Sequence, residues 1–365
     1  MSGATTPRAS APAGGRVTPA GASGPATAGG ASGAPALVTV VGAPAPATPA
    51  AASARATAVP AVPADALARP APARATVRFA ALGDSLTEGI GDPVQGGWRG
   101  WAALLAEGLG GSERDVEFRN LAVAGALSAD VHERQAAAAA EFRPDIASVV
   151  VGVNDTLRRS FDIRLLTERL DEVCALLAGG GAVLLTACLP DPGTALGLPG
   201  PLRRPLARRQ QAVNAVVHAL SARYDSVHLH ASDRTWTEDR SLWSVDRLHP
   251  AERGHRRLAA GFHRLLAERG LALGTRPGHE PRQPPPTRAA AALWLATEGT
   301  GWLARRSTDL LPQLLGLAAA EAGHWARGTG ERLDARAEQA LFEALAGLPR
   351  TPFLQGFVPH ARMEG

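Results

Sequence analysis

Apolar runs and amphipathic stretches alternate along the middle of the chain. Five short apolar runs predict strands, at residues 76–83, 116–120, 145–152, 182–188 and 226–230. Stretches with apolar residues at helical spacing follow them, at residues 98–109, 129–140, 164–177, 205–224 and 251–268. Strands that alternate with helices predict right-handed crossovers and therefore a parallel sheet.

The third and fourth predicted strands are continuous apolar runs, DIASVVVG and AVLLTAC. Strands of this kind are covered on both faces. We therefore expect an α/β fold, a three-layer α/β/α sandwich with a five-stranded parallel sheet, over residues 76–274. Ligands of such sheets bind beyond the carboxyl ends of the strands, so polar residues that follow a strand directly are the first candidates for chemistry.

The segments on either side of this domain have a different composition. Residues 1–75 are mostly Ala, Pro, Gly, Thr and Ser, and we expect a disordered tail because they can bury little apolar surface. Two alternatives stay open: a dispensable tail, or sequence that precedes a native start near Val77. Residues 275–287 predict a Pro-rich linker, and residues 288–365 predict a helical C-terminal extension, with helices near 288–305, 308–324 and 331–345.

The net positive charge of the chain lies in the tail. Residues 1–75 hold five Arg and one Asp, a net charge of +4, and the whole chain also has a formal net charge of +4. The remaining residues sum to zero, so we expect no nucleic-acid partner. Neither a signal peptide nor an apolar run long enough to cross a bilayer is present, which predicts no transmembrane segment and a cytoplasmic location. The oligomeric state stays open.

Four short segments near the predicted strand ends carry residues with chemistry. GDSLTEG follows the first strand and places Ser85 at a strand-to-helix turn, where its N–H can also bind an oxyanion. The loop after the second strand contains Gly125, whose N–H no Cβ shields. GVND follows the third strand and offers the amide of Asn154 at the same edge. DRLHP precedes the last helix, with Asp246 three residues before His249.

Each segment alone has an ordinary structural explanation: a helix cap, a turn glycine, a capped loop or a chance spacing. Together they supply a complete catalytic set at one edge of one sheet. A Ser hydroxyl needs a base to take its proton, and the base needs a carboxylate to hold its tautomer. The combination predicts a Ser85–His249–Asp246 triad, with Ser85, Gly125 and Asn154 as the oxyanion hole.

The order of these segments resembles that of the SGNH hydrolase superfamily, also called GDSL lipases/acylhydrolases. Ser85, Gly125, Asn154 and His249 match the four residues that name it, and Asp246 completes the last motif block. The resemblance covers about residues 76–270. It implies a flavodoxin-like fold and an esterase that cleaves a small-molecule acyl ester through an acyl-enzyme, with no cofactor and no metal. The C-terminal part looks like an extension of some actinobacterial members.

Several alternatives to an esterase stay open. An acyltransferase with a small hydroxyl acceptor would use the same residues, and a catalytically silent ligand-binding domain would use the same scaffold. A nucleotide-binding α/β domain is disfavoured, because both phosphate-binding glycine motifs are missing. The substrate stays open as well, since lipid, thioester, carbohydrate acetyl and aryl esters all suit this catalytic set.

The remaining Cys and His residues predict structural roles. Two cysteines, Cys174 and Cys188, make no disulfide framework and no metal-ligand spacing, so both are expected to be buried as small hydrophobic residues. His228 and His230 alternate on the last strand, and His255 lies on the last helix. None has an acidic partner at metal-ligand spacing, and we expect structural or solvated roles for all three.

Two tryptophans follow the Ser85 loop. Trp98 and Trp101 could form a wall of an acyl pocket, but tryptophan at the start of a helix more often belongs to the core. We therefore expect core positions for both.

Overall fold

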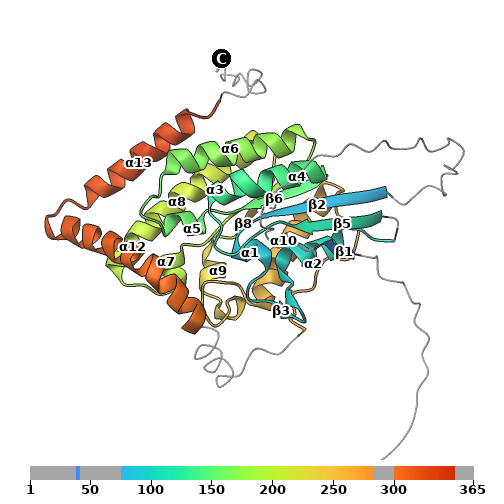
Figure 1. Ribbon diagram of the computed structural model, residues 1–365, viewed down its shortest axis with the longest axis horizontal. Coiled ribbons are helices and arrows are strands. Elements are labelled where there is room, and N and C mark those ends of the chain that lie inside the picture. The colour runs from blue at the N-terminus through green and yellow to red at the C-terminus, as the bar shows by residue number, and fades with distance from the viewer. Residues whose placement is uncertain (1–37, 42–74, 113, 283–299, 350–365) are drawn as a thin grey trace, which may run out of the picture. The chain divides into compact units, whose positions relative to one another are not determined.

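A parallel sheet of six strands organises the computed structural model, which describes residues 38–41, 75–112, 114–282 and 300–349. The strands lie in the order β1-β5-β2-β6-β7-β8 (Figure 1). Their bounds are Val38–Val41 (β1), Ala75–Gly83 (β2), Arg114–Asn120 (β5), Ile146–Val150 (β6), Val183–Cys188 (β7) and Val227–His230 (β8). Five of them are the predicted strands, and all pair in parallel, which confirms the expected sheet.

The sixth strand, β1, comes from the segment expected to be disordered. It pairs in parallel with β5, and Val38 lies opposite Val116. Its sequence VTVV consists of β-branched residues, which favour extended backbone. The structure thus describes one short strand within the segment expected to be disordered. Residues 1–37 and 42–74 lie outside the described residues.

The strand order reverses between β2 and β6. Without β1, the strands lie in the flavodoxin-like order, with the first strand of the domain between the second and the third. The carboxyl end of β2 leads into α1 (Ser85–Glu88), and β6 leads into α5 (Val153–Thr156). Ligands of open α/β sheets bind at such a reversal, so the fold brings two of the four predicted segments to the expected place.

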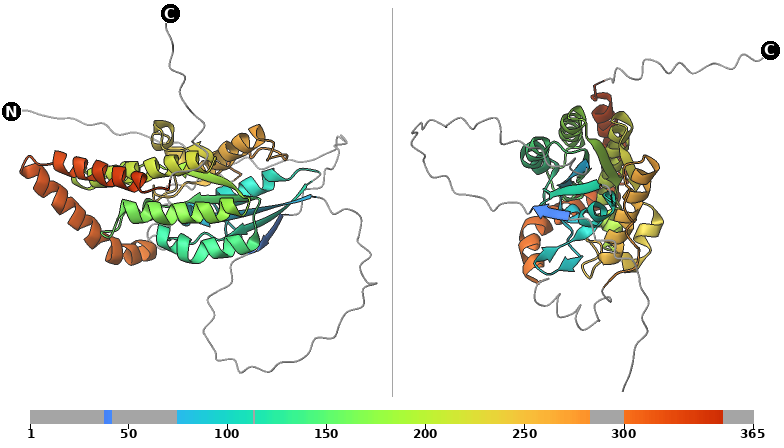
Figure 2. Two further views of the ribbon diagram at one scale, coloured as in Figure 1. Left: turned by 90° about the horizontal axis from the view of Figure 1, so that it is seen from above. Right: turned by 90° about the vertical axis from the view of Figure 1, so that its right-hand side faces the viewer.

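Helices cover both faces of the sheet (Figure 2). One face packs against α2 and α10, where Trp101 stacks on Phe262. The other face packs against α4, α6 and α8. The bounds are Gly100–Leu109 (α2), Ala136–Phe142 (α4), Ile163–Gly179 (α6), Gly200–Arg223 (α8) and Glu252–Glu268 (α10). The three-layer architecture is confirmed, and Cys174 of α6 is buried in it as predicted.

Short elements fill the connections at the carboxyl edge of the sheet. They are β3 (Pro93–Val94), β4 (Gly97–Trp98), α7 (Pro192–Ala195), α9 (Arg234–Thr237) and the 3-10 helix η3 (Arg240–Leu242). β3 and β4 pair as a small antiparallel ribbon. Periodicity does not predict elements of this length.

The helix predicted at residues 129–140 is interrupted. It consists of α3 (Ser128–Asp130), a turn of π-helix (Val131–Gln135) and α4. Gln135, at the end of the π turn, accepts a hydrogen bond from the N–H of Gly83 at 2.8 Å and donates one to its carbonyl at 2.9 Å. This pair of bonds fixes the end of β2, two residues before Ser85.

The C-terminal extension is helical, as predicted, but its helices have other bounds. α12 (Thr300–Ala326) continues through the break expected between residues 305 and 308, and α13 is Glu331–Ala346. Residues 288–299 lie outside the described residues. Both helices pack on α8, where Arg208 contacts Glu321 at 3.2 Å and Asp334 at 2.7 Å.

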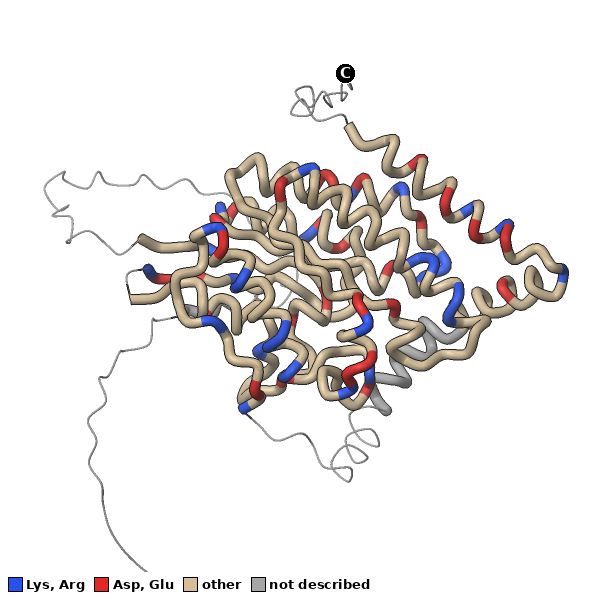
Figure 3. Tube along the Cα trace, turned by 180° about the vertical axis from the view of Figure 1, so that it is seen from behind, with Lys and Arg blue, Asp and Glu red and all other residues tan. Residues whose placement is uncertain are grey.

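Basic and acidic residues are interspersed over these elements (Figure 3). The expectation of no nucleic-acid partner stays a prediction. Among the described residues, no helix combines the length and apolar character needed to cross a membrane.

Gly83→Ala should destabilise the protein strongly. Gly83 has φ +153°, and a Cβ there would lie 2.3 Å from the carbonyl oxygen of Val150. Positive φ costs alanine about 1–2 kcal/mol, and displacing a packed backbone group adds about 1–3 kcal/mol. Urea unfolding should show both losses. Gly181→Ala is the matched control, because Gly181 has φ +91° and nothing within 4 Å of its Cβ position; equal losses at the two sites would contradict this account.

Candidate active site

Ser85 begins a one-turn helix at the carboxyl end of β2. Asp84 caps this helix, and its Oδ1 accepts a hydrogen bond from the N–H of Leu86 at 3.1 Å. Ser85 is 9% exposed. The sharp turn after Gly83 thus places its hydroxyl at the rim of the sheet, where the predicted nucleophile belongs.

A tight turn before α10 carries Asp246 and His249. Oδ1 of Asp246 accepts three hydrogen bonds, from Oγ of Ser244 at 2.6 Å and from the N–H groups of Leu248 at 2.9 Å and His249 at 3.0 Å. Arg247, within the turn, has φ +55°. The carboxylate therefore organises the backbone that carries the histidine.

Three of the predicted residues form a continuous hydrogen-bonded chain. Oγ of Ser85 lies 2.9 Å from Nε2 of His249, and Nδ1 of His249 lies 2.6 Å from Oδ2 of Asp246. The His249 side chain is 6% exposed and that of Asp246 is 11% exposed. Ser85 and His249 are 164 residues apart in sequence, so only the fold joins them.

The charge of Asp246 fixes the proton positions in this chain. Burial alone would raise the pKa of Asp246, but hydrogen bonds from His249 and Ser244 outweigh it and lower the pKa to about 2. The carboxylate is therefore ionised at neutral pH and holds the hydrogen of His249 on Nδ1. Nε2 is then the nitrogen that accepts the hydroxyl hydrogen of Ser85.

A buried ion network joins the region that follows the Ser85 helix to α10, the helix that follows the turn with His249. Arg99 donates to Asp92 at 2.9 Å and to Glu252, at the start of α10, at 2.9 Å. The Asp92 side chain is 3% exposed. Beside it, Gly91 lies so close to Pro250 that a Cβ would meet the Pro250 carbonyl oxygen at 1.9 Å. This network could not be predicted from the sequence, because nothing in one sequence links residues 153 positions apart.

His255 strengthens the same junction. Its Nδ1 accepts from the N–H of Trp101 at 3.2 Å, and its Nε2 donates to the carbonyl of Ile90 at 3.0 Å. Burial lowers the pKa of His255 to about 4, so the ring stays neutral. The structural role predicted for His255 is confirmed.

The loop after β5 and the loop after β6 meet beside Ser85. Asp155 accepts hydrogen bonds from the N–H and the hydroxyl of Ser128, at 3.1 and 2.6 Å. Nδ2 of Asn154 donates to Oδ2 of Asp84 at 3.1 Å and to the carbonyl of Ala126 at 3.2 Å. The amide of Asn154 is thus already engaged by the protein, a detail that spacing did not predict.

Gly125 lies next to the Ala126 carbonyl that Asn154 contacts and has φ +81°. Within the described part of the chain, the N–H groups of Gly125 and Ser85 donate to no protein acceptor. The three residues expected to bind an oxyanion thus offer two backbone N–H groups without a protein acceptor and one side-chain amide that is held by Asp84 and Ala126.

An apolar pocket opens beside Ser85 and His249. Its apolar lining consists of Leu86, Val153, Leu157, Leu189, Pro190, Pro192, Ala195, Ala231, Trp236, Trp243, Leu248, Pro250 and Leu258. The polar residues that line it are Asp84, Ser85, Asn154 and His249. Among the described residues, no cluster of three or more His, Cys, Asp or Glu side chains that could share a metal ion lines this pocket.

The tryptophans that line the pocket are not the two considered from the sequence. Trp101 is buried in the core, as expected, whereas Trp98 is 40% exposed, so its predicted core position is wrong. Trp236 and Trp243 line the pocket instead, and the indole N–H of Trp243 donates to the carbonyl of Trp236 at 2.7 Å. Trp236 lies in the one-turn helix α9 and Trp243 directly follows η3, and hydrophobic periodicity does not resolve elements this short.

Comparison with known proteins agrees with this arrangement. The sequence profile of the GDSL-like lipase/acylhydrolase family matches residues 81–257, which include all five predicted site residues. The matched segment belongs to this family. The family resemblance drawn from the motifs is thereby confirmed.

Individual relatives of this GDSL-family domain are distant. An arylesterase from Vibrio mimicus is 28% identical over 110 residues, 30% of this chain and 53% of that protein, so the chain spans about half the length of that curated relative. An acetylxylan esterase from Geobacillus stearothermophilus is 18% identical, with a TM-score of 0.44 over 52% of this chain and 94% of that one. A lipase/acylhydrolase from Enterococcus faecalis is 18% identical, with a TM-score of 0.43 over 53% and 96%.

Asp246→Asn should remove a pH-dependent part of the stability. Because the folded-state pKa lies below the ordinary value of 3.8, the carboxylate stabilises the protein above that value, and this contribution is lost as the pH falls toward 2. The shift corresponds to roughly 2 kcal/mol. Urea unfolding of the native protein and the variant at pH 6 and near pH 2.5 should show a difference in the free energy of unfolding that shrinks by most of this amount. Asp225→Asn, at a side chain 93% exposed, is the control; a pH-independent difference for Asp246→Asn would contradict the assigned role.

Proposed function

We propose that the protein is a serine esterase that cleaves acyl esters through an acyl-enzyme on Ser85. The observation that carries the proposal is the hydrogen-bonded chain from Ser85 through His249 to Asp246, with its 2.9 and 2.6 Å contacts. Membership in the GDSL-like family supports the same chemistry.

In the first half of the reaction, Oγ of Ser85 attacks the ester carbonyl carbon while Nε2 of His249 takes its proton. The negative charge of Asp246 stabilises the imidazolium that forms. His249 then gives the proton to the leaving alkoxide as the ester bond breaks. In the second half, water attacks the acyl-enzyme with His249 again as the base, and Ser85 is restored.

The developing oxyanion takes its hydrogen bonds from the N–H groups of Ser85 and Gly125 and from the Asn154 amide. Donors fixed in advance stabilise the transition state without reorganisation. Asn154 must exchange one acceptor to take part, because both of its Nδ2 hydrogens face protein oxygens, on Asp84 and Ala126. The carboxylate of Asp84 keeps this amide close to Ser85 until then.

The pocket supports an ester whose acyl or alcohol part is apolar. Its walls are mainly aliphatic and aromatic, and its polar groups gather at Ser85, His249 and Asn154. The chemistry as proposed uses only protein groups, so the expectation that no cofactor or metal takes part stays a prediction. Hydrolysis and transfer to a hydroxyl acceptor share the acyl-enzyme and differ only in what attacks it.

Ser85→Ala should abolish both labelling by a fluorophosphonate and hydrolysis of p-nitrophenyl acetate, the latter by at least about 10³-fold in kcat, because no other group can form the acyl-enzyme. Ser160→Ala, at an exposed serine outside the pocket, is the matched control and should keep both. Labelling of Ser85→Ala at the native rate would overturn the proposal. Product analysis with added alcohols would separate hydrolysis from transfer.

Asn154→Ala should lower kcat for the same ester by about 10²–10³-fold and change KM little, since the donor acts mainly in the transition state. Steady-state kinetics together with the thermal midpoint separates this effect from unfolding. A large rise in KM at normal kcat would instead make Asn154 a residue for ground-state binding.

A further inference from the structure

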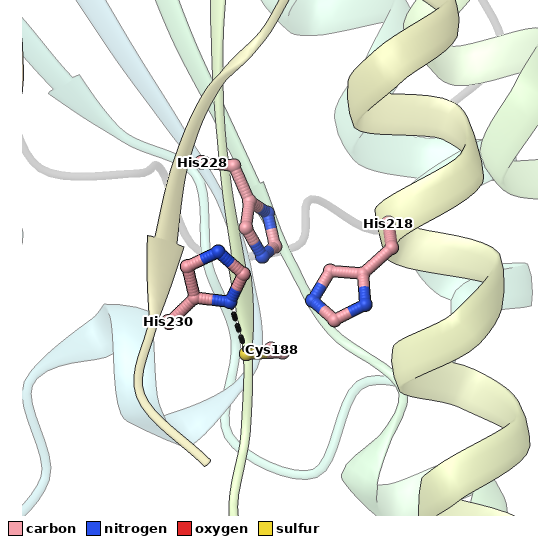
Figure 4. Close-up of side chains that lie close together, drawn as sticks. All are labelled: Cys188, His218, His228 and His230. Atoms are coloured by element: carbon pink, nitrogen blue, oxygen red, sulfur yellow. Dashed lines mark hydrogen bonds between the residues drawn. The ribbon is translucent and has the colours of Figure 1, made fainter. Parts of the chain in front are cut away.

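A second group of polar side chains lies at the edge of the sheet, on the side covered by α8. Cys188 ends β7, and His230 ends β8 directly beside it in the parallel register. His228, two residues earlier on β8, faces the same side of the sheet. His218 reaches toward them from α8, so that one thiol and three imidazoles point toward one another (Figure 4).

The four side chains lie close enough to share one metal ion. One ligand atom from each lies within 4.8 Å of all the others. Sγ of Cys188 and Nδ1 of His230 are 3.7 Å apart. Tetrahedral zinc, bound at about 2.1 Å to nitrogen and about 2.3 Å to sulfur, separates its ligands by roughly 3.4–3.6 Å. The 3.7 Å separation of Sγ and Nδ1 is thus close to the value that a tetrahedral zinc site requires.

The surroundings of His228 orient it for this role. Its Nδ1 lies 3.0 Å from Oγ1 of Thr186 and 3.1 Å from Oγ of Ser221. The Ser221 hydroxyl donates its own hydrogen to the carbonyl of Val217 at 2.6 Å, so it accepts from Nδ1 of His228. This arrangement leaves the lone pair of the ring on Nε2, as in zinc-bound histidines held by a hydrogen bond on the other nitrogen.

Nε2 of His228 is buried and has no hydrogen-bond partner in the described part of the chain. An unpaired buried acceptor costs free energy, and a bound cation would satisfy it.

The other ligands have suitable surroundings. Cys188 is buried, and the Ser232 hydroxyl donates to its Sγ at 3.2 Å. His218 and His230 are exposed and provide a path for an ion from solvent. This environment meets the requirements of ligand set, supporting hydrogen bonds and access for a metal site.

We propose that Cys188, His218, His228 and His230 form a structural zinc site that joins α8 to the edge of the sheet. Four protein ligands leave no open coordination position, which is typical of structural rather than catalytic zinc. On binding, the Cys188 thiol releases its proton to solvent as the S–Zn bond forms.

The site borders the pocket without reaching Ser85. Leu189 and Ala231 follow two of the ligands directly in sequence, and both line the pocket. Zinc would therefore stabilise one wall of the pocket. The proposal gives ligand roles to His228 and His230, for which the sequence indicated structural or solvated roles, because folding brings His218 and Cys188 to them.

Co²⁺ titration of the full-length, metal-free protein tests the proposal. Co²⁺ occupies tetrahedral Cys/His sites and reports them in its absorption spectrum. We expect one Co²⁺ per chain, intense tetrahedral ligand-field bands and a thiolate-to-metal charge-transfer band, all lost on addition of Zn²⁺. Zn²⁺ alone should raise the thermal midpoint, because it binds the folded state.

Variants then assign the ligands. Cys188→Ser should abolish the charge-transfer band, and His218→Ala, at an exposed position that leaves the core intact, should weaken Co²⁺ binding at least about 100-fold. Cys174→Ala and His132→Ala, outside the cluster, are matched controls and should leave the charge-transfer band and the Co²⁺ affinity unchanged. No stoichiometric binding, a charge-transfer band that survives Cys188→Ser, or affinity unaffected by His218→Ala would each overturn the proposal.

Discussion

The buried bridge from Asp92 through Arg99 to Glu252 is the interaction on which the rest of the site depends. It joins the loop after α1 to the start of α10, and so places the turn with His249 against the helix that begins with Ser85. Removing one partner of a buried ion pair leaves an uncompensated charge and is strongly destabilising. The 2.9 Å contact of Ser85 with His249 therefore rests on charges that take no part in the chemistry.

The reversal of strand order supplies the second half of the arrangement. β2 and β6 are neighbours, so the segments that follow them meet at one edge, where Asp84 contacts Asn154. Asp246 has a comparable double task, because one oxygen organises its own turn and the other orients His249. The carboxylates of Asp84 and Asp246 thus each orient one further side chain of the site through a hydrogen bond.

Much of this arrangement could be predicted from the sequence. The five strands of the domain and the polar segments at their ends follow from continuous apolar runs and short motifs, and these placed Ser85 and His249 at one edge. The features that the sequence did not predict depend on long-range contacts or on very short elements. β1 lies in a segment whose composition predicts disorder, and Trp236 belongs to a single helical turn. The cluster around His228 needs a helix and two strands at once, which no local spacing reveals.

The central claim is that Ser85 carries the acyl group during turnover. Acid quenching of the full chain within the first turnovers of a p-nitrophenyl ester, followed by peptide mass analysis, measures this directly. Acylation of Ser85 predicts a mass increase equal to one acyl group on the peptide that contains Ser85, and no such increase in the Ser85→Ala variant. Rapid turnover with no acylated peptide, or an acyl group on another residue, would contradict it.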